Sequence, residues 1–139
     1  MNELLAGKVK TVYDVDGDAQ RVLIKFHDKV TAWNGKHVEY PPEKGKVCCL
    51  ISALLFEMCE KNGIKNHYIK TEGLDSLLCK KLTIIPVEVI VRNIAAGSIV
   101  KNTNINEGVL IQPPIVEYFL KDDAKGDPLL TYDLSLIHI

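Results

Sequence analysis

The sequence predicts an α+β fold built from antiparallel β-strands and one long helix, and three patterns carry this prediction. Apolar residues alternate through residues 7–13 and 21–26, and the Asp16-Gly17 pair between these segments is typical of a hairpin turn. Residues 47–58 then repeat apolar side chains at helical spacing. Two more short extended segments, 64–70 and 77–82, follow the helix, so we expect a mostly antiparallel sheet.

Length and composition limit the classes of function. A chain of 139 residues fits one modest domain, or part of a larger one. The net charge is -1, and no block of like charge is present, which argues against a nucleic-acid or membrane-surface protein held by bulk electrostatics. The longest apolar runs are too short to span a bilayer, and the N-terminus carries no secretory signal pattern.

The four cysteines are interpreted as buried thiols of a protein in a reducing cytosol. They form no Cys-x-x-Cys pair and have no histidine spacing suited to zinc. The sequence therefore predicts a cytoplasmic protein. The residues concerned are Cys48, Cys49, Cys59 and Cys79.

The first hairpin offers a phosphate-binding interpretation. Gly7 precedes Lys8 and Lys10, which would share one face of a strand over residues 7–13. Two ammonium groups on one face suit a polyphosphate. The alternative is a solvated lysine face on an ordinary hairpin, because the segment is neither a Walker loop nor a complete Gly-x-Gly-x-x-Gly.

The helix follows a turn signal at Asn34-Gly35, where Trp33 is expected in the core or in the wall of a cleft. Pro41-Pro42 ends the extended segment, and Asn62-Gly63 ends the helix. We expect one apolar stripe of the helix to pack on the sheet, flanked by Cys48, Phe56 and Cys59. This stripe consists of Val47, Leu50, Ile51, Leu54, Leu55 and Met58.

Residues 80–84 are a candidate connector between two lobes. Here the chain leaves the sheet, so its backbone N–H and C=O groups are available to a ligand. Such a connector is a common way to hold a flat base such as adenine.

The stretch 84–98 combines an apolar strand with polar groups. Alternation places Glu88 and Arg92 on one face, and we expect the opposite face, with Val87, Val89 and Val91, to be core. A buried Glu and Arg are costly unless they are paired or bound to a ligand. The small residues 95–98 that follow allow close approach of a phosphate, and Arg92 adds a charged fork. The alternative is a strand-end Arg–Glu pair before a tight turn.

The remaining chain is expected to contain a short helix within residues 100–108 and two extended segments, 109–111 and 115–120, around Pro113-Pro114. An acidic loop, residues 121–128, follows them. This loop is either a solvated turn or a source of carboxylates for a substrate.

Four segments together resemble the SAICAR synthetase (phosphoribosylaminoimidazole-succinocarboxamide synthase) family in order and spacing. The similarity runs from Leu5 to Tyr132. The segments are Gly-Lys-Val-Lys-Thr-Val-Tyr at 7–13, Ala-Trp-Asn-Gly-Lys at 32–36, Ile-Pro-Val-Glu-Val-Ile-Val-Arg-Asn-Ile-Ala-Ala-Gly-Ser at 85–98 and Lys-Asp-Asp-Ala-Lys-Gly-Asp-Pro at 121–128.

The resemblance implies a two-lobed α+β fold, distantly kinase-like or ATP-grasp-like, with the site between the lobes. Residues 1–83 would form a small, β-rich nucleotide-covering lobe with one helix. Residues 84–133 would begin a larger substrate-binding lobe, and 134–139 are interpreted as a non-native tail that resembles translated adapter or vector sequence.

The family's reaction is an ATP-dependent ligation of de novo purine biosynthesis. It joins L-aspartate to carboxyaminoimidazole ribotide (CAIR) and gives SAICAR, ADP and phosphate through an acyl phosphate, with magnesium as a further cofactor. The full-length enzyme is a candidate homo-oligomer, although the sequence alone does not give the oligomeric state. The alternative function is a non-catalytic module that binds ATP or another nucleotide.

The resemblance assigns roles residue by residue. The ATP-binding set is Gly7, Lys8, Val9, Lys10, Val12, Lys80, Lys81, Leu82 and Ile84. The substrate-binding set is Glu88, Arg92, Ser98 and Asp127, with Arg92 and Ser98 on the ribotide phosphate.

This sequence departs from the family in two further ways. Cys48-Cys49-Leu50 replaces an Asn-Lys pair at the start of the first helix. Family members also continue beyond the Asp-Pro loop with an Asp-x-Lys-x-Glu-Phe-Gly signature and the magnesium ligands. We therefore expect no metal ligands in this chain, an inactive fragment, and apolar surface left exposed.

Overall fold

The computed structural model describes residues 1–32 and 37–138, which form two compact units, Met1–Leu82 and Thr83–Ile139. Trp33 and the turn expected at Asn34-Gly35 lie outside the described residues. Among the helices of the described residues, none is both long and apolar enough to cross a membrane.

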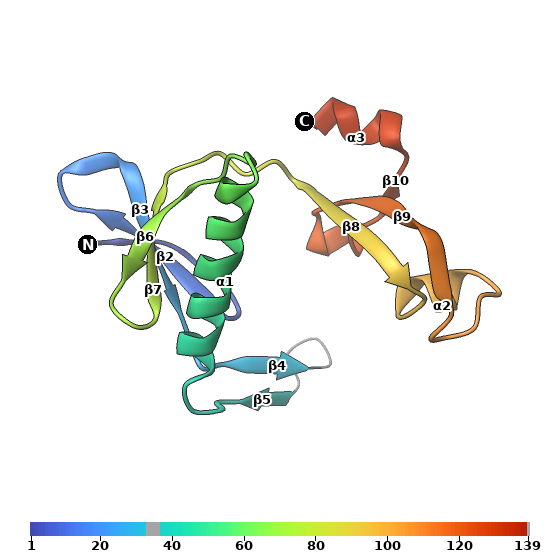
Figure 1. Ribbon diagram of the computed structural model, residues 1–139, viewed down its shortest axis with the longest axis horizontal. Helices are drawn as coiled ribbons and strands as arrows, with labels where there is room; N and C mark the ends of the chain where they lie inside the picture. The colour runs from blue at the N-terminus through green and yellow to red at the C-terminus, as the bar shows by residue number, and fades with distance from the viewer. Residues whose placement is uncertain (33–36, 139) are drawn as a thin grey trace. The chain divides into compact units, whose positions relative to one another are not determined.

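The first unit is built on a five-stranded antiparallel sheet with the order β1-β2-β3-β7-β6 (Figure 1). A separate two-stranded hairpin, β4 with β5, precedes the helix. The strands are β1 (Glu3–Ala6), β2 (Lys10–Val15), β3 (Asp18–Phe26), β4 (Val30–Ala32), β5 (His37–Glu39), β6 (Tyr68–Glu72) and β7 (Ser76–Lys80). The antiparallel pairing and the β2–β3 hairpin around Asp16-Gly17 are confirmed.

The strand expected over residues 7–13 is confirmed only from Lys10 onward, and its first three residues are not in a strand. An extra strand, β1, pairs with β2, and residues 7–9 form the turn between them. The N–H of Gly7 donates to the Lys10 carbonyl at 2.8 Å, and a Cβ on Gly7 would lie 3.1 Å from that oxygen. The tight closure therefore favours glycine. Lys8 lies in this turn and Lys10 begins β2, so the two lysines do not share a strand face.

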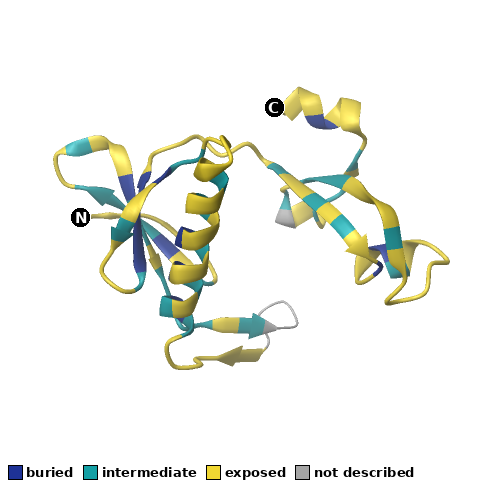
Figure 2. Ribbon diagram, in the orientation of Figure 1, coloured by how far each residue is buried: buried dark blue, intermediate teal, exposed yellow. Residues whose placement is uncertain are grey.

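The helix α1 (Lys44–Lys61) forms and ends at Asn62 as expected, but it packs through the opposite face. Gly45, Cys49 and Ala53 are buried against the sheet, whereas the large apolar stripe is exposed; Leu50, for example, is 59% exposed (Figure 2). The physical reason is space, because a Cβ on Gly45 would lie only 3.0 Å from the Phe26 carbonyl. Small side chains allow this close approach of helix and sheet.

The core of the first unit joins the small-residue face of α1 to the sheet. Phe56, from the same helix, stacks on Tyr68 with ring centroids 5.8 Å apart. Val12 of β2 packs against this cluster. The buried members of the cluster are Val22, Cys49, Ala53, Tyr68, Leu77 and Cys79.

The second unit is built on a three-stranded antiparallel sheet with the order β10-β9-β8. Its elements are β8 (Val87–Ile94), α2 (Ser98–Asn102), β9 (Leu110–Leu120), the 3-10 helix η1 (Asp123–Lys125), β10 (Leu129–Leu130) and α3 (Tyr132–His138). A short helix forms, but α2 covers Ser98–Asn102 and so begins two residues before the expected segment 100–108. The two segments expected around Pro113-Pro114 are instead one continuous strand, β9, with a cis bond between Gln112 and Pro113.

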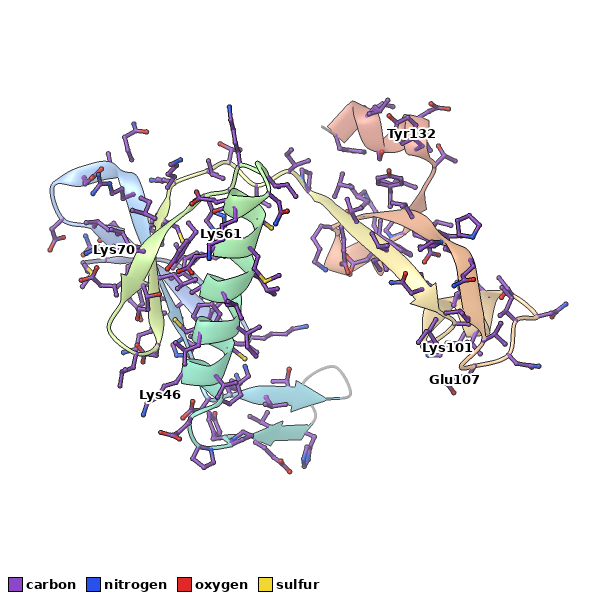
Figure 3. The ribbon with its side chains drawn as sticks, in the orientation of Figure 1. Lys46, Lys61, Lys70, Lys101, Glu107 and Tyr132 are labelled. Atoms are coloured by element: carbon purple, nitrogen blue, oxygen red, sulfur yellow. The ribbon has the colours of Figure 1, made fainter. Side chains whose placement is uncertain are left out.

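The valine face of β8 is not core, which corrects the expectation. Val89 and Val91 are 54% and 59% exposed. Their cross-strand partners on β9 are Tyr118 and Val116. Val87, on the same face, is half-buried. The Tyr118 ring lies 5.8 Å from that of Tyr132, which is labelled in Figure 3 at the start of α3. Ser98, after β8, and Asp127, in the loop after β9, lie instead beside the opposite face of β8, the face that carries Glu88.

Candidate functional site

Three of the residues expected to bind substrate line one pocket in the second unit. Glu88 comes from β8, Ser98 is the first residue of α2, and Asp127 belongs to the loop after β9. The pocket measures about 420 Å³. Its other lining residues are Ile90, Asn102, Phe119, Gly126, Pro128 and Leu129.

Strand pairing explains how this pocket is assembled. Glu88 lies directly opposite Phe119 across the β8–β9 pair, so both side chains project from the same face of the sheet. β10 pairs with the other edge of β9 through Leu129 and Phe119, which brings the end of the 121–128 loop beside β8's polar face. The strand order therefore gathers residues that are far apart in sequence.

Arg92 is held by three hydrogen bonds at the edge of this site. Its Nε donates to Glu117 Oε2 at 2.6 Å, Nη1 donates to the Ala96 carbonyl at 2.7 Å, and Nη2 donates to Ser98 Oγ at 3.3 Å. The side chains of Arg92 and Glu117 are only 11% and 19% exposed. A charge-assisted pair in such a position is stronger than one in open solvent. The guanidinium is therefore fixed before any ligand binds.

Glu117 is the residue that the sequence analysis missed. It lies opposite Ile90, while Arg92 lies opposite Ile115, so Glu117 and Arg92 are diagonal neighbours on one face. The available signal was a lone carboxylate within the apolar strand 115–120, the same kind of signal that singled out Glu88. Arg92 thus pairs with a glutamate, but the partner is Glu117 rather than Glu88.

The small-residue turn lies between β8 and α2. Ala95 is fully buried, and its N–H donates to the Val109 carbonyl at 2.8 Å. Gly97 adopts a φ of 67°, a left-handed value that favours glycine. The turn thereby places the Ala96 carbonyl and the Ser98 hydroxyl against Arg92.

Asp127 has a conformation that its side chain must stabilise. Its φ is 48°, which is uncommon for a residue other than glycine. Its carboxylate accepts hydrogen bonds from the Asp122 N–H at 2.9 Å and from Lys121 Nζ at 2.8 Å. In the same loop, a hydrogen bond from Lys125 lowers the pKa of Asp122. Asp127 therefore holds the loop together while it lines the pocket.

The residues expected to bind ATP fall at two ends of the first unit's sheet. Gly7, Lys8 and Val9 form the β1–β2 turn, and Lys10 pairs with Phe26 at the end of β3. Lys10 Nζ lies 6.0 Å from the centroid of the Phe26 ring, a cation–π contact. Val12, on β2, packs on the core between these ends.

The connector begins at the other end of β3. Lys80 ends β7 opposite Arg21, and the Lys81 N–H donates to the Gln20 carbonyl at 2.8 Å. In the part of the chain that the structure describes, the backbone N–H groups of Leu82 and Ile84 donate no hydrogen bond. The boundary between the two units falls directly after Leu82. The connector thus has backbone groups available to a ligand.

The side chains that could ligate a metal do not cluster among the described residues, and the four thiols are buried or partly buried. Residues 1–32 and 37–138 contain no cluster of three or more His, Cys, Asp or Glu side chains that could hold a metal ion. All four cysteines are free, and burial raises the pKa of the Cys79 thiol to about 11, which keeps it protonated and unreactive.

Comparisons with known proteins give consistent likenesses. A family model described as SAICAR synthetase matches residues 3–138. Phosphoribosylaminoimidazole-succinocarboxamide synthase of Synechocystis sp. is 44% identical over 137 residues, which cover 99% of this chain and 52% of the relative. The chain thus spans about half the length of this curated relative.

Solved structures match the fold. The structure of "SAICAR synthetase (Type-2) in complex with ADP" gives a TM-score of 0.89 at 33% identity and covers 96% of this chain and 56% of that one. SAICAR-synthase from Saccharomyces cerevisiae complexed with SAICAR gives 0.76 at 25% identity, with 99% and 58% covered. The expected α+β fold is confirmed by these likenesses.

Proposed function

Because the chain belongs to the SAICAR synthetase family, we propose that it supplies the nucleotide-binding and ribotide-binding parts of an ATP-dependent ligase of purine biosynthesis. The proposed reaction joins L-aspartate to the carboxylate of CAIR. ATP phosphorylates that carboxylate and leaves as ADP, and the aspartate amine then attacks the acyl carbon. The C–O bond to phosphate breaks, the amine loses a proton, and the amide of SAICAR remains.

The observation that carries the proposal is the arrangement of Arg92 and Ser98 beside the pocket that Glu88 and Asp127 line. A guanidinium has five N–H donors, of which the described contacts use three. One N–H is left on each terminal nitrogen, a geometry that suits two oxygens of a phosphate. The yeast relative is described as complexed with SAICAR, a ribotide, which supports ribotide binding as the proposed role.

Glu88 and Asp127 bring carboxylates to the same pocket. A carboxylate accepts hydrogen bonds only, so Glu88 suits the amino group or the ribose hydroxyls of the ribotide. Asp127 would face the substrate from the loop side, where its αL backbone conformation sets the direction of the side chain.

The first unit suits a nucleotide in extended form. Arg21, opposite Lys80, and Phe26, opposite Lys10, lie roughly 17 Å apart along β3 at about 3.4 Å per residue. Adenine would bind the connector's free backbone groups, and the phosphates would lie under the Gly7–Lys10 turn with its two lysines. The relative crystallised in complex with ADP supports nucleotide binding.

Ligand binding to the chain as it stands tests the proposal. Calorimetric titration of the chain is expected to show binding of both ADP and SAICAR. A non-catalytic nucleotide module would bind ADP but not SAICAR. Binding of neither ligand would contradict both functions.

Cellular location and assembly are part of the same proposal. We expect a cytoplasmic protein whose full-length relatives form homo-oligomers. Size-exclusion chromatography of one such relative would check the second expectation.

A further inference from the structure

Glu117, on β9, contacts Arg92 and is not among the residues expected to bind a ligand. Its Oε2 accepts from Arg92 Nε at 2.6 Å, and both side chains are largely shielded from solvent. We propose that Glu117 is a positioning residue, which holds the Arg92 guanidinium so that its two terminal nitrogens face the phosphate of the ribotide. This inference rests on the proposed function, because it assumes that Arg92 binds that phosphate.

The sheet fixes where Glu117 lies. On its face of β9, the neighbours two positions away are Ile115 and Phe119, both apolar. A carboxylate between apolar neighbours is costly unless it is paired. Since the described contacts give Glu117 a single ion-pair partner, Arg92, the two side chains order each other.

The contact also decides which edge of the guanidinium is presented. An unrestrained arginine can bind phosphate either through Nε with one terminal nitrogen or through both terminal nitrogens. Glu117 occupies the Nε donor, so only the end-on mode remains. The Ala96 carbonyl and the Ser98 hydroxyl then keep the terminal nitrogens at the turn where the phosphate is expected.

A positioning role and a purely electrostatic role predict effects of opposite sign. Glu117 reduces the net positive charge around Arg92. If charge alone mattered, removal of Glu117 would raise the affinity for phosphate. If Glu117 positions Arg92, its removal releases the guanidinium and lowers that affinity, because ordering must then occur on binding.

The test uses the full chain, SAICAR, and the matching riboside that lacks the 5′-phosphate. We expect Glu117→Ala to weaken SAICAR binding about tenfold and Glu117→Gln by less, because the amide oxygen still accepts from Nε. Affinity for the riboside should not change in either variant. Glu107→Gln, on the loop before β9, is the matched control and should bind as the unchanged chain does.

A second readout is the NMR signal of the Arg92 Nε–H without ligand. It reports whether Glu117 orders Arg92, independently of whether Arg92 binds a phosphate. The signal is expected to be resolved and slow to exchange in the unchanged chain and lost in Glu117→Ala. Equal or tighter SAICAR binding by Glu117→Ala, with this signal lost, would overturn the positioning role alone. If the unchanged chain binds SAICAR and the riboside with equal affinity, the proposed function is wrong. The positioning role is then wrong too, even if the NMR signal shows that the Arg92–Glu117 pair is intact. If Glu117→Ala does not fold, Glu117→Gln must still weaken SAICAR binding, and unchanged or tighter binding contradicts the positioning role.

Discussion

Cys79 illustrates at the scale of one residue how burial sets chemistry. Its side chain is fully buried in the first unit, and the pKa of its thiol rises from 9.0 to about 11 because the thiolate would lose its hydration. Above pH 9 the unfolded chain therefore loses a proton that the folded chain retains. We expect the free energy of unfolding to fall as the pH rises from about 9 to about 11.

Urea denaturation across this pH range checks the prediction. Cys79→Ala should show a shallower fall than the unchanged chain, because the titrating thiol is gone. Cys48→Ala, which changes a partly exposed thiol, is the control and should keep the full slope. Equal slopes for all three proteins would show that Cys79 does not contribute.

Alternation along a strand predicts which side chains share a face only where the strand itself forms, so it failed for Lys8 and Lys10, because residues 7–9 form a turn. Alternation placed Glu88 and Arg92 on one face, and the structure brings Ser98 and Asp127 to the same site. Glu117, 25 positions from Arg92, was missed because the register of two distant strands cannot be read from either strand alone.

At the scale of an element, the helix α1 likewise shows that local sequence patterns do not reveal contacts with distant segments. Its existence and its end at Asn62 could be predicted, since a 3.6-residue period and an Asn-Gly stop are local signals. Its packing face could not, because periodicity identifies an apolar stripe but not what covers it. The structure packs the helix through small residues, which allow the closest approach to the sheet.

The start of α1 is stabilised by a residue from another segment. Glu43, at the N-cap position, makes no side-chain capping bond, and the Gly45 N–H instead donates to Asp28 Oδ1 at 2.8 Å. Asp28 thus takes the role of a cap, and its negative charge also interacts favourably with the positive end of the helix dipole.

Asp28→Ala is expected to reduce the free energy of unfolding by about 1 kcal/mol, the usual cost of losing a helix cap. Asp28→Asn should cost less, since the amide oxygen still accepts the hydrogen bond. Chemical denaturation followed by circular dichroism measures both. A loss as large in Asp28→Asn as in Asp28→Ala would contradict the capping role.

At the scale of the whole molecule, each unit, taken by itself, has an apolar face that is exposed in its described residues. One is the stripe on α1 that includes Leu50 and Leu54, and the other is the valine face of β8 with Val89 and Val91. Exposed apolar patches of this kind favour association. We therefore expect the chain to self-associate as its concentration rises.

Sedimentation velocity over a series of concentrations measures this association. The double change Leu50→Gln with Leu54→Gln should shift the chain towards monomer without loss of helix signal, because both side chains are on the exposed face of α1. Lys61→Gln, at the polar end of the same helix, is the control. A chain that stays monomeric throughout would contradict the expectation.

We propose two binding regions in this chain, the turn and connector for a nucleotide and the Arg92 site of the second unit for a ribotide phosphate. The chain spans about half the length of the curated relatives it matches, and ligand binding is the property proposed for it. The proposed ribotide binding depends most on the contact between Arg92 and the phosphate.

The most direct measurement compares SAICAR and its dephosphorylated riboside as ligands of the unchanged chain and of Arg92→Lys. Lysine keeps the charge but loses the fork, so SAICAR binding should weaken by about 1.5–3 kcal/mol while riboside binding stays the same. Equal affinity of the two proteins for SAICAR, or an equal loss for both ligands, would contradict a phosphate site at Arg92.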